Sequence, residues 1–208
     1  MKKGIEGLSA VLGVLIVGIC VWAAAVPQEI PWSPHAPVAW GDFLGAPPST
    51  AAAQAEAAAI HMTIRWSVSF TVTQDPRTGR WSGSVDPGSI EVANTMQPHL
   101  SWAFSGKESS SVLRHEQGHF DLNEAYARRL AVALLPVCAQ GDTADAAKAA
   151  LKTAIDAAAA RVLDALQIAQ RRYDAETVHG TDSALQGQWQ AAIGAWLVDP
   201  AAVPLSFD

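Results

Sequence analysis

The stretch VLRHEQGHFDLNEAYARRLAVAL, residues 112–134, carries the pattern that decides the fold. Its apolar and histidine positions recur at intervals of three and four residues, which places them on one face of an α-helix. The members of this face are Val112, His115, His119, Leu122, Tyr126, Leu130 and Leu134. Serines at 109–111 offer N-caps, and Pro136 and Gly141 close the segment. We therefore expect a long helix whose two histidines share its apolar face.

His115 and His119 are four residues apart, about one helical turn, so both imidazoles can bind one ion. Zinc accepts histidine nitrogen and prefers four ligands. Glu116 lies beside the first ligand, where a carboxylate can take a proton from an attacking water and pass it to the leaving amine. HExxH also arises by chance, and the alternative is a surface helix with two solvated histidines. The apolar face favours the metal site, because an unpaired polar group there is costly.

The rest of the chain predicts an α+β fold, with a small antiparallel sheet followed by helices. Residues 61–73 alternate apolar and polar, which is typical of a half-buried strand, and two more strands are expected near 80–85 and 89–93. Further helices are predicted over 143–177 and 183–197. The alanine-rich residues 49–60 predict a short additional helix.

Composition limits the functional classes. The chain has 208 residues, half of them hydrophobic, which suits one globular domain. Its net charge of -6, without a cluster of basic residues, argues against nucleic-acid binding. Of its two cysteines, Cys20 lies in an N-terminal apolar segment, which leaves Cys138 without a partner for a disulfide.

Residues 1–25 are expected to form a signal peptide or a membrane anchor, followed by one domain over 26–208. Lys2 and Lys3 precede an uncharged stretch, residues 8–26, which ends in an alanine triplet at 23–25. The triplet favours cleavage, whereas the length of the stretch leaves a membrane tether open. Either interpretation places the domain outside the cytoplasm, in the periplasm or secreted.

Three motifs carry a resemblance to a known family. HEQGHFD at 115–121, YDAETVHG at 173–180 and WGDFLG at 40–45 resemble the HEQGHFD, YDxxTxHG and WxDFxG elements of a bacterial family. That family is catalogued as a domain of unknown function and described as predicted secreted zinc-dependent proteases. The resemblance implies a zincin-like fold, a Zn²⁺ cofactor and peptidase chemistry on a peptide or protein substrate.

The third metal ligand stays open in the sequence. Leu122 and Ala125 stand where a metzincin has glycine and its third histidine, so the ligand must come from elsewhere. We favour His179, just past the helix over 143–177, with Asp174 and Glu176 as rivals.

Two nearby side chains have open roles. Tyr173 either donates a hydrogen bond to an oxyanion or ends the apolar stripe of its helix. Asp121 or Asp174 is a candidate for orienting a ligand imidazole. The sequence thus favours an exported zinc-dependent peptidase with Glu116 as general base and Tyr173 as a second catalytic candidate. A non-catalytic, metal-stabilised binding protein of the envelope is the alternative.

The alanine triplet leads to the first prediction, that the mature protein begins at Val26. Signal peptidase accepts small residues at the positions before the cut, and residues 23–25 provide them. N-terminal sequencing of the protein from its native host checks this. Recovery of chains that still begin with Met1 in the membrane fraction would show an anchor instead.

Overall fold

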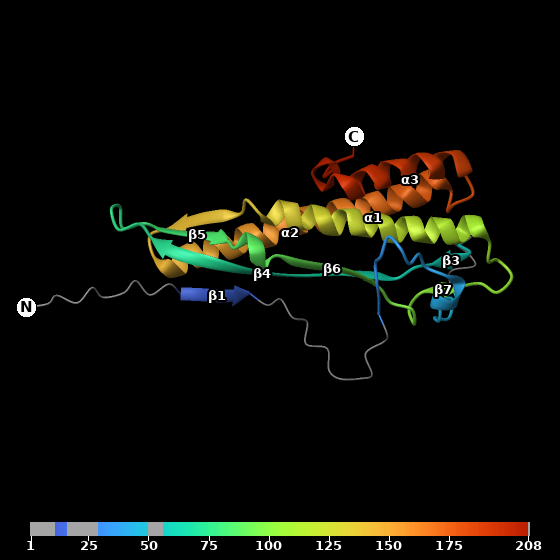
Figure 1. Cartoon of the computed structure of the whole chain (residues 1–208), viewed down its shortest axis with the longest axis horizontal. Coiled ribbons are helices and arrows are strands. Elements are labelled where there is room, and N and C mark those ends of the chain that lie inside the picture. The colour runs from blue at the N-terminus through green and yellow to red at the C-terminus, as the bar shows by residue number, and fades with distance from the viewer. Residues whose placement is uncertain (1–10, 16–28, 50–55, 208) are drawn as a thin grey trace, which may run out of the picture.

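The computed structural model describes residues 11–15, 29–49 and 56–207. These residues form an α+β structure in which helices cover one face of an antiparallel sheet (Figure 1), as the sequence predicts. The expected cleavage before Val26 lies outside the described residues. No helix within the described ranges combines the length and the hydropathy needed to cross a membrane.

The main sheet is built around one long strand, β4 (Met62–Gln74). The strand order is β2-β6-β4-β5-β8, and every pairing is antiparallel. The other members are β2 (Ile30–Pro31), β5 (Trp81–Val85), β6 (Glu91–Met96) and β8 (Cys138–Gly141). A further strand, β1 (Val11–Leu15), pairs with the second half of β4. The predicted alternation along β4 is confirmed, because Val68, Phe70 and Val72 are buried.

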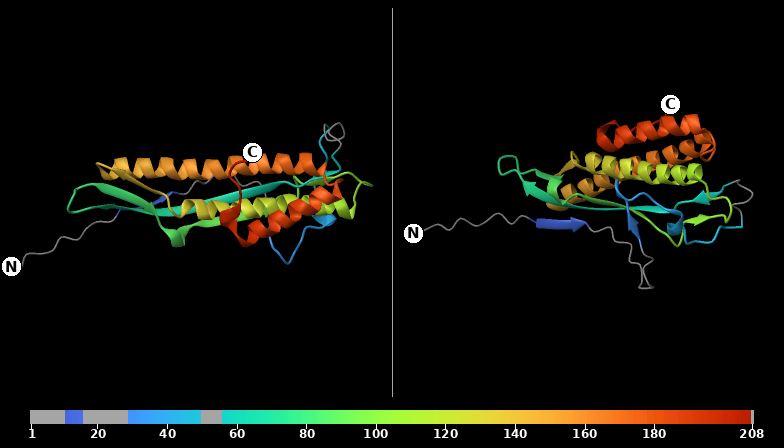
Figure 2. Two further views of the ribbon diagram at one scale, coloured as in Figure 1. Left: turned by 90° about the horizontal axis from the view of Figure 1, so that it is seen from above. Right: turned by 45° about the vertical axis from the view of Figure 1, so that its right-hand side comes forward.

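Three helices of the described chain lie on one face of the sheet. Their first and last residues are close to the predicted ones. The helices are α1 (Ser110–Leu134), α2 (Ala144–Thr177) and α3 (Ser183–Val198). The Ser109, Thr143 and Asp182 side chains cap their N-termini. Figure 2 shows α1 and α2 lying side by side along the sheet, with α3 packed across them. Short 3-10 turns occupy Trp40–Asp42, Pro87–Ser89 and Pro200–Ala202.

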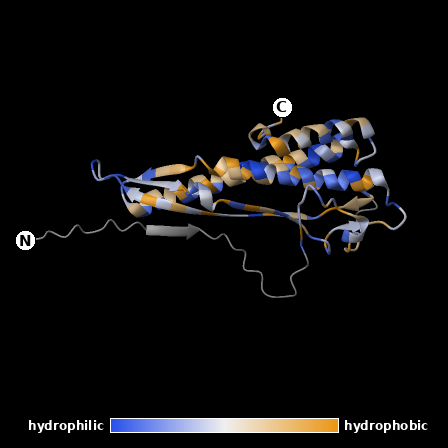
Figure 3. Ribbon diagram, viewed as in Figure 1, coloured by the Kyte–Doolittle hydropathy of each residue, from blue (hydrophilic) through white to orange (hydrophobic). Residues whose placement is uncertain are grey.

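The hydrophobic core lies between the sheet and the helices. Leu130 of α1 and Leu151, Ile155 and Val162 of α2 are fully buried there, against Val68 of β4. Figure 3 shows hydrophobic and hydrophilic residues interspersed along each helix. This is the amphipathic pattern that the spacing along each helix predicts.

One local expectation was wrong. Ala58 and Ala59, in the stretch predicted as a helix, form strand β3 (Ala58–Ala59), which pairs with β7 (Trp102–Ala103). The pairing partner is distant in sequence, so tertiary contact overrides local propensity.

Candidate metal centre

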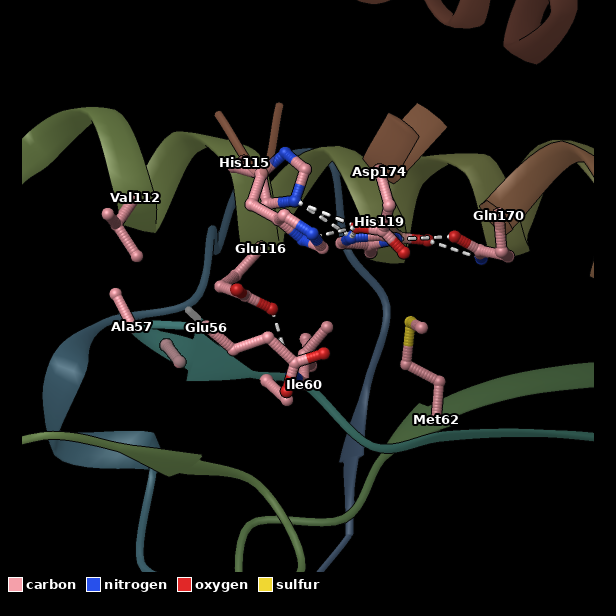
Figure 4. Close-up of a pocket in the computed structure, with 13 residues that line it drawn as sticks. Glu56, Ala57, Ile60, Met62, Val112, His115, Glu116, His119, Gln170 and Asp174 are labelled. Carbon is pink, nitrogen blue, oxygen red and sulfur yellow. Dashed lines mark hydrogen bonds and ion pairs between the residues drawn. The ribbon is translucent and has the colours of Figure 1, made fainter. Parts of the chain in front are cut away.

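The antiparallel packing of α1 and α2 brings the start of the HExxH motif to the end of α2 (Figure 1). His115 and His119, one turn apart on α1, both point Nε2 at Asp174 of α2 (Figure 4). The Asp174 Oδ1 atom lies 3.2 Å from Nε2 of His115 and 2.9 Å from Nε2 of His119. One ligand atom from each of these residues lies within 4.8 Å of the other two, so this group is able to hold a metal ion.

The third position in this group is held by Asp174, one of the two carboxylates that the sequence left open, and not by the favoured His179. The His179 Nδ1 atom is 3.5 Å from Asp174 Oδ1, and its side chain is 41% exposed at the rim. The physical reason is helical geometry: Asp174 is still inside α2 and faces α1, whereas His179 follows the end of the helix. Glu176 points away, since its carboxylate pairs with Arg172 and accepts from the Trp189 indole at 2.7 Å.

Hydrogen bonds on the far side of each imidazole fix which nitrogen faces the centre. Gln170 donates its amide to the His119 carbonyl at 3.2 Å, so its Oε1 accepts from His119 Nδ1 at 2.5 Å. Thr177 donates its hydroxyl to the Tyr173 carbonyl at 2.6 Å, so its oxygen accepts from His115 Nδ1, 3.3 Å away. With a proton on each Nδ1, the Nε2 atom of a neutral imidazole presents a lone pair to the centre, whereas a protonated imidazole donates from Nε2 to Asp174.

The Glu116 side chain lies beside the same group of residues. It is only 3% exposed, and its Oε2 accepts from the backbone N–H of Ile60, just after β3, at 2.8 Å. A cavity of about 230 Å³ opens beside it, lined among others by Glu116, the three candidate ligands, His179 and residues 56–60. Figure 4 shows the Glu116 carboxylate lying between the imidazoles above and Ile60 below.

The two carboxylates of the site have opposite electrostatic surroundings. Burial raises the pKa of Glu116 to about 7. Burial alone would raise the pKa of Asp174 as well, but the hydrogen bonds to His115 and His119 outweigh it and lower that pKa below its ordinary value. Asp174 is therefore the permanently ionised group suited to a cation, whereas Glu116 is suited to exchanging a proton near neutral pH.

Tyr173 supports the centre from behind. It is fully buried, its ring stacks on His115 at 4.7 Å between centroids, and its hydroxyl donates to the His115 carbonyl at 3.3 Å. Tyr173 does not line the cavity. These contacts match the second of the two roles left open by the sequence, the end of the apolar stripe.

Two other residues of the HEQGHFD motif hold the N-terminal segment. Gln117 accepts from the backbone N–H of Val38 at 2.8 Å, and Asp121 accepts from the Trp32 indole at 2.8 Å. Gln117 also donates to Asp121 at 2.7 Å. Asp121, expected as a candidate to orient a ligand imidazole, fixes the segment before β3 instead. Sequence reasoning assigned no role to Gln117, Gln170 or Thr177, whose only signal was their presence in or near the motifs.

Comparison with known proteins assigns the chain to a family without a known function. Residues 46–180 match the model of a family described as a bacterial protein of unknown function (DUF922), so the chain belongs to that family. The match includes both the HEQGHFD and the YDAETVHG segments. No curated protein matches the chain, and no solved structure matches it.

The contact between Gly118 and Tyr173 leads to a prediction about stability. A Cβ at Gly118 would lie 2.1 Å from the Tyr173 hydroxyl, so Gly118→Ala forces α1 and α2 apart beside both histidines. We expect the free energy of unfolding, measured by urea denaturation, to fall by about 1–3 kcal/mol. Gly187 of α3 has no atom within 4 Å of its would-be Cβ and is the matched control. Gly187→Ala should raise stability by up to about 1 kcal/mol, and equal effects of the two substitutions would contradict the close contact.

Proposed function

We propose that this member of the DUF922 family is an exported, zincin-like peptidase that uses zinc. The observation that carries the proposal is the arrangement of four side chains around one cavity. His115, His119 and Asp174 present three ligand atoms within 4.8 Å of one another, and the buried carboxylate of Glu116 lines the same cavity. Three protein ligands with an open position are typical of catalytic zinc sites, whereas structural sites are closed by four.

The chemistry of the donors fits a divalent cation. Two imidazole lone pairs and an ionised carboxylate meet at separations of 2.9–3.2 Å, and the hydrogen bonds of Gln170 and Thr177 keep both Nδ1 protons on the outer side. Such a group of acceptors is stabilised by a positive charge at its centre. Two histidine nitrogens and one carboxylate oxygen are ligands that zinc accepts. When bound, zinc would polarise a carbonyl and acidify a water molecule.

Glu116 is the residue that would handle protons. Its pKa of about 7 lets it accept a proton from the attacking water and return it to the leaving amine at neutral pH. The Ile60 N–H holds one carboxylate oxygen, so the side chain keeps its orientation toward the cavity. Keeping a carboxylate buried at 3% exposure is costly, and a role in proton transfer accounts for this burial better than a structural role does.

The cavity suits a peptide segment. One wall consists of Ala57, Ala58 and Ala59, and Met62 and Val112 add apolar surface. Ala58 and Ala59 form the short strand β3, and a wall of extended chain with small side chains suits an extended ligand such as a peptide. We extend the proposal to location, because the apolar residues 8–26 with their alanine triplet are typical of an export signal or a membrane tether.

The first test concerns the metal site. Asp174→Ala should weaken zinc binding by more than about a hundredfold, because even outer partners of a ligand contribute tenfold to a hundredfold. Glu176→Ala is the matched control, since this carboxylate lies on the same helix but pairs with Arg172 and Trp189. Titration with a fluorescent zinc chelator measures both affinities. Wild-type affinity in Asp174→Ala would contradict the assignment of the third ligand.

The second test concerns Glu116. Glu116→Gln should retain one zinc per chain, because Glu116 is not among the three grouped ligands. Hydrolysis of fluorescein-labelled casein and of a peptide library should fall by about a hundredfold to ten-thousandfold. Glu124→Gln is the control, because Glu124 lies on the same helix and pairs with Arg128. Absence of hydrolysis by the zinc-loaded wild type would favour the non-catalytic envelope protein.

A further inference from the structure

We infer that His179 is a catalytic residue that donates a hydrogen bond to the substrate carbonyl oxygen as negative charge develops on it. The inference rests on the proposed peptidase function and adds a residue to it. His179 lines the cavity together with Glu116 and the three candidate ligands. Its side chain is 41% exposed, which leaves the imidazole accessible to a bound molecule.

The His179 imidazole lies next to the three candidate ligands but is not one of them. The His179 ring centroid lies 6.4 Å from that of His115, and its Nδ1 lies 3.5 Å from Asp174 Oδ1. Among the described residues, the Asp174 carboxylate, at 3.5 Å, is the nearest polar partner of the His179 side chain. Since His115, His119 and Asp174 already supply three ligands, a fourth from His179 would close the position that a substrate needs.

The backbone at this place is held in an unfavourable conformation. Val178 and His179 both adopt positive φ angles, 49° and 51°, and these are the only non-glycine residues in the described chain that do so. A β-branched residue such as valine rarely adopts this region, and such conformations cost of order 1–3 kcal/mol each. Strain of this kind persists where surrounding contacts enforce it, and it concentrates at functional sites.

The contacts that enforce the turn come from the metal centre itself. The His179 N–H donates to the Asp174 carbonyl at 3.0 Å, and the Gly180 N–H donates to the Thr177 hydroxyl at 3.3 Å. Gly180 packs so tightly on His115 that a Cβ there would lie 2.7 Å from the His115 Cβ. The backbone of His179 is therefore fixed relative to the candidate ligands, as a preorganised donor requires.

This geometry explains the arrangement of the YDAETVHG segment. Asp174 and Thr177 serve the metal centre, Val178 and Gly180 form the turn, and the turn places the His179 imidazole at the cavity rim. A donor of this type supplies about a hundredfold to a thousandfold in rate when it meets the developing oxyanion. Glu116 and His179 thus have separate tasks, with proton transfer assigned to the first and charge stabilisation to the second.

The test uses the cobalt-loaded protein and acetohydroxamate, a small oxyanion ligand for metal sites. In His179→Ala, the cobalt absorption bands and the affinity for cobalt should be unchanged. The affinity for acetohydroxamate should fall by about tenfold to a hundredfold, the effect of losing one hydrogen bond to a charged group. His179→Gln, which keeps an N–H donor, should recover part of this affinity. His99→Ala is the control, because His99 is exposed and does not line the cavity.

The possible results distinguish the role of His179 from the proposed peptidase function. Loss of cobalt binding in His179→Ala would make His179 a metal ligand and overturn the inference, as would unchanged acetohydroxamate affinity. Failure of the wild type to bind cobalt or acetohydroxamate would overturn the proposed function itself. With casein as substrate, a fall in kcat of about a hundredfold or more in His179→Ala, with KM little changed, would support the assignment.

Discussion

The close approach of α1 and α2 at Gly118 is the constraint on which the site depends. The Tyr173 ring lies where a side chain at position 118 would be, stacked on His115 and edge-on to His119 at 4.8 Å. A residue with a Cβ at this position would separate the helices and move the ligands on α1 away from Asp174 on α2. The glycine inside the HExxH motif is thus set by packing rather than by chemistry.

Around this contact the protein collects charged and polar groups that would be unfavourable in a dry core. They are tolerated because each has a partner: Asp174 contacts both imidazoles, Gln170 and Thr177 hold the outer nitrogens, and Ile60 holds Glu116. Buried polar networks of this type are stable only when every member is satisfied. Under the proposed function, a cation would complete the network between the two histidines and Asp174, and metal binding would then be linked to folding.

The HEQGHFD motif also holds the N-terminal segment against α1. Gln117 and Asp121 bind it at Val38 and Trp32, and the chain then leads to β3 and to the Ile60 N–H that holds Glu116. The two polar motif residues that do not face the candidate metal centre therefore act on the opposite side of α1. The HEQGHFD motif serves both sides of the helix, which accounts for its length beyond HExxH.

The sequence by itself determined the α+β class, the three helices, the long alternating strand and the pair of histidines with Glu116. These features depend on local periodicity and on spacing within one element, which are readable along the chain. Only the tertiary structure shows that Asp174, and not Glu176 or His179, groups with His115 and His119, because the distances to α1 depend on the rotation of α2 and on where it ends. It also decided that Tyr173 packs behind His115 and that Ala58 and Ala59 form a strand. Each of those outcomes depends on a contact with residues far away in the sequence, which a local sequence pattern does not reveal.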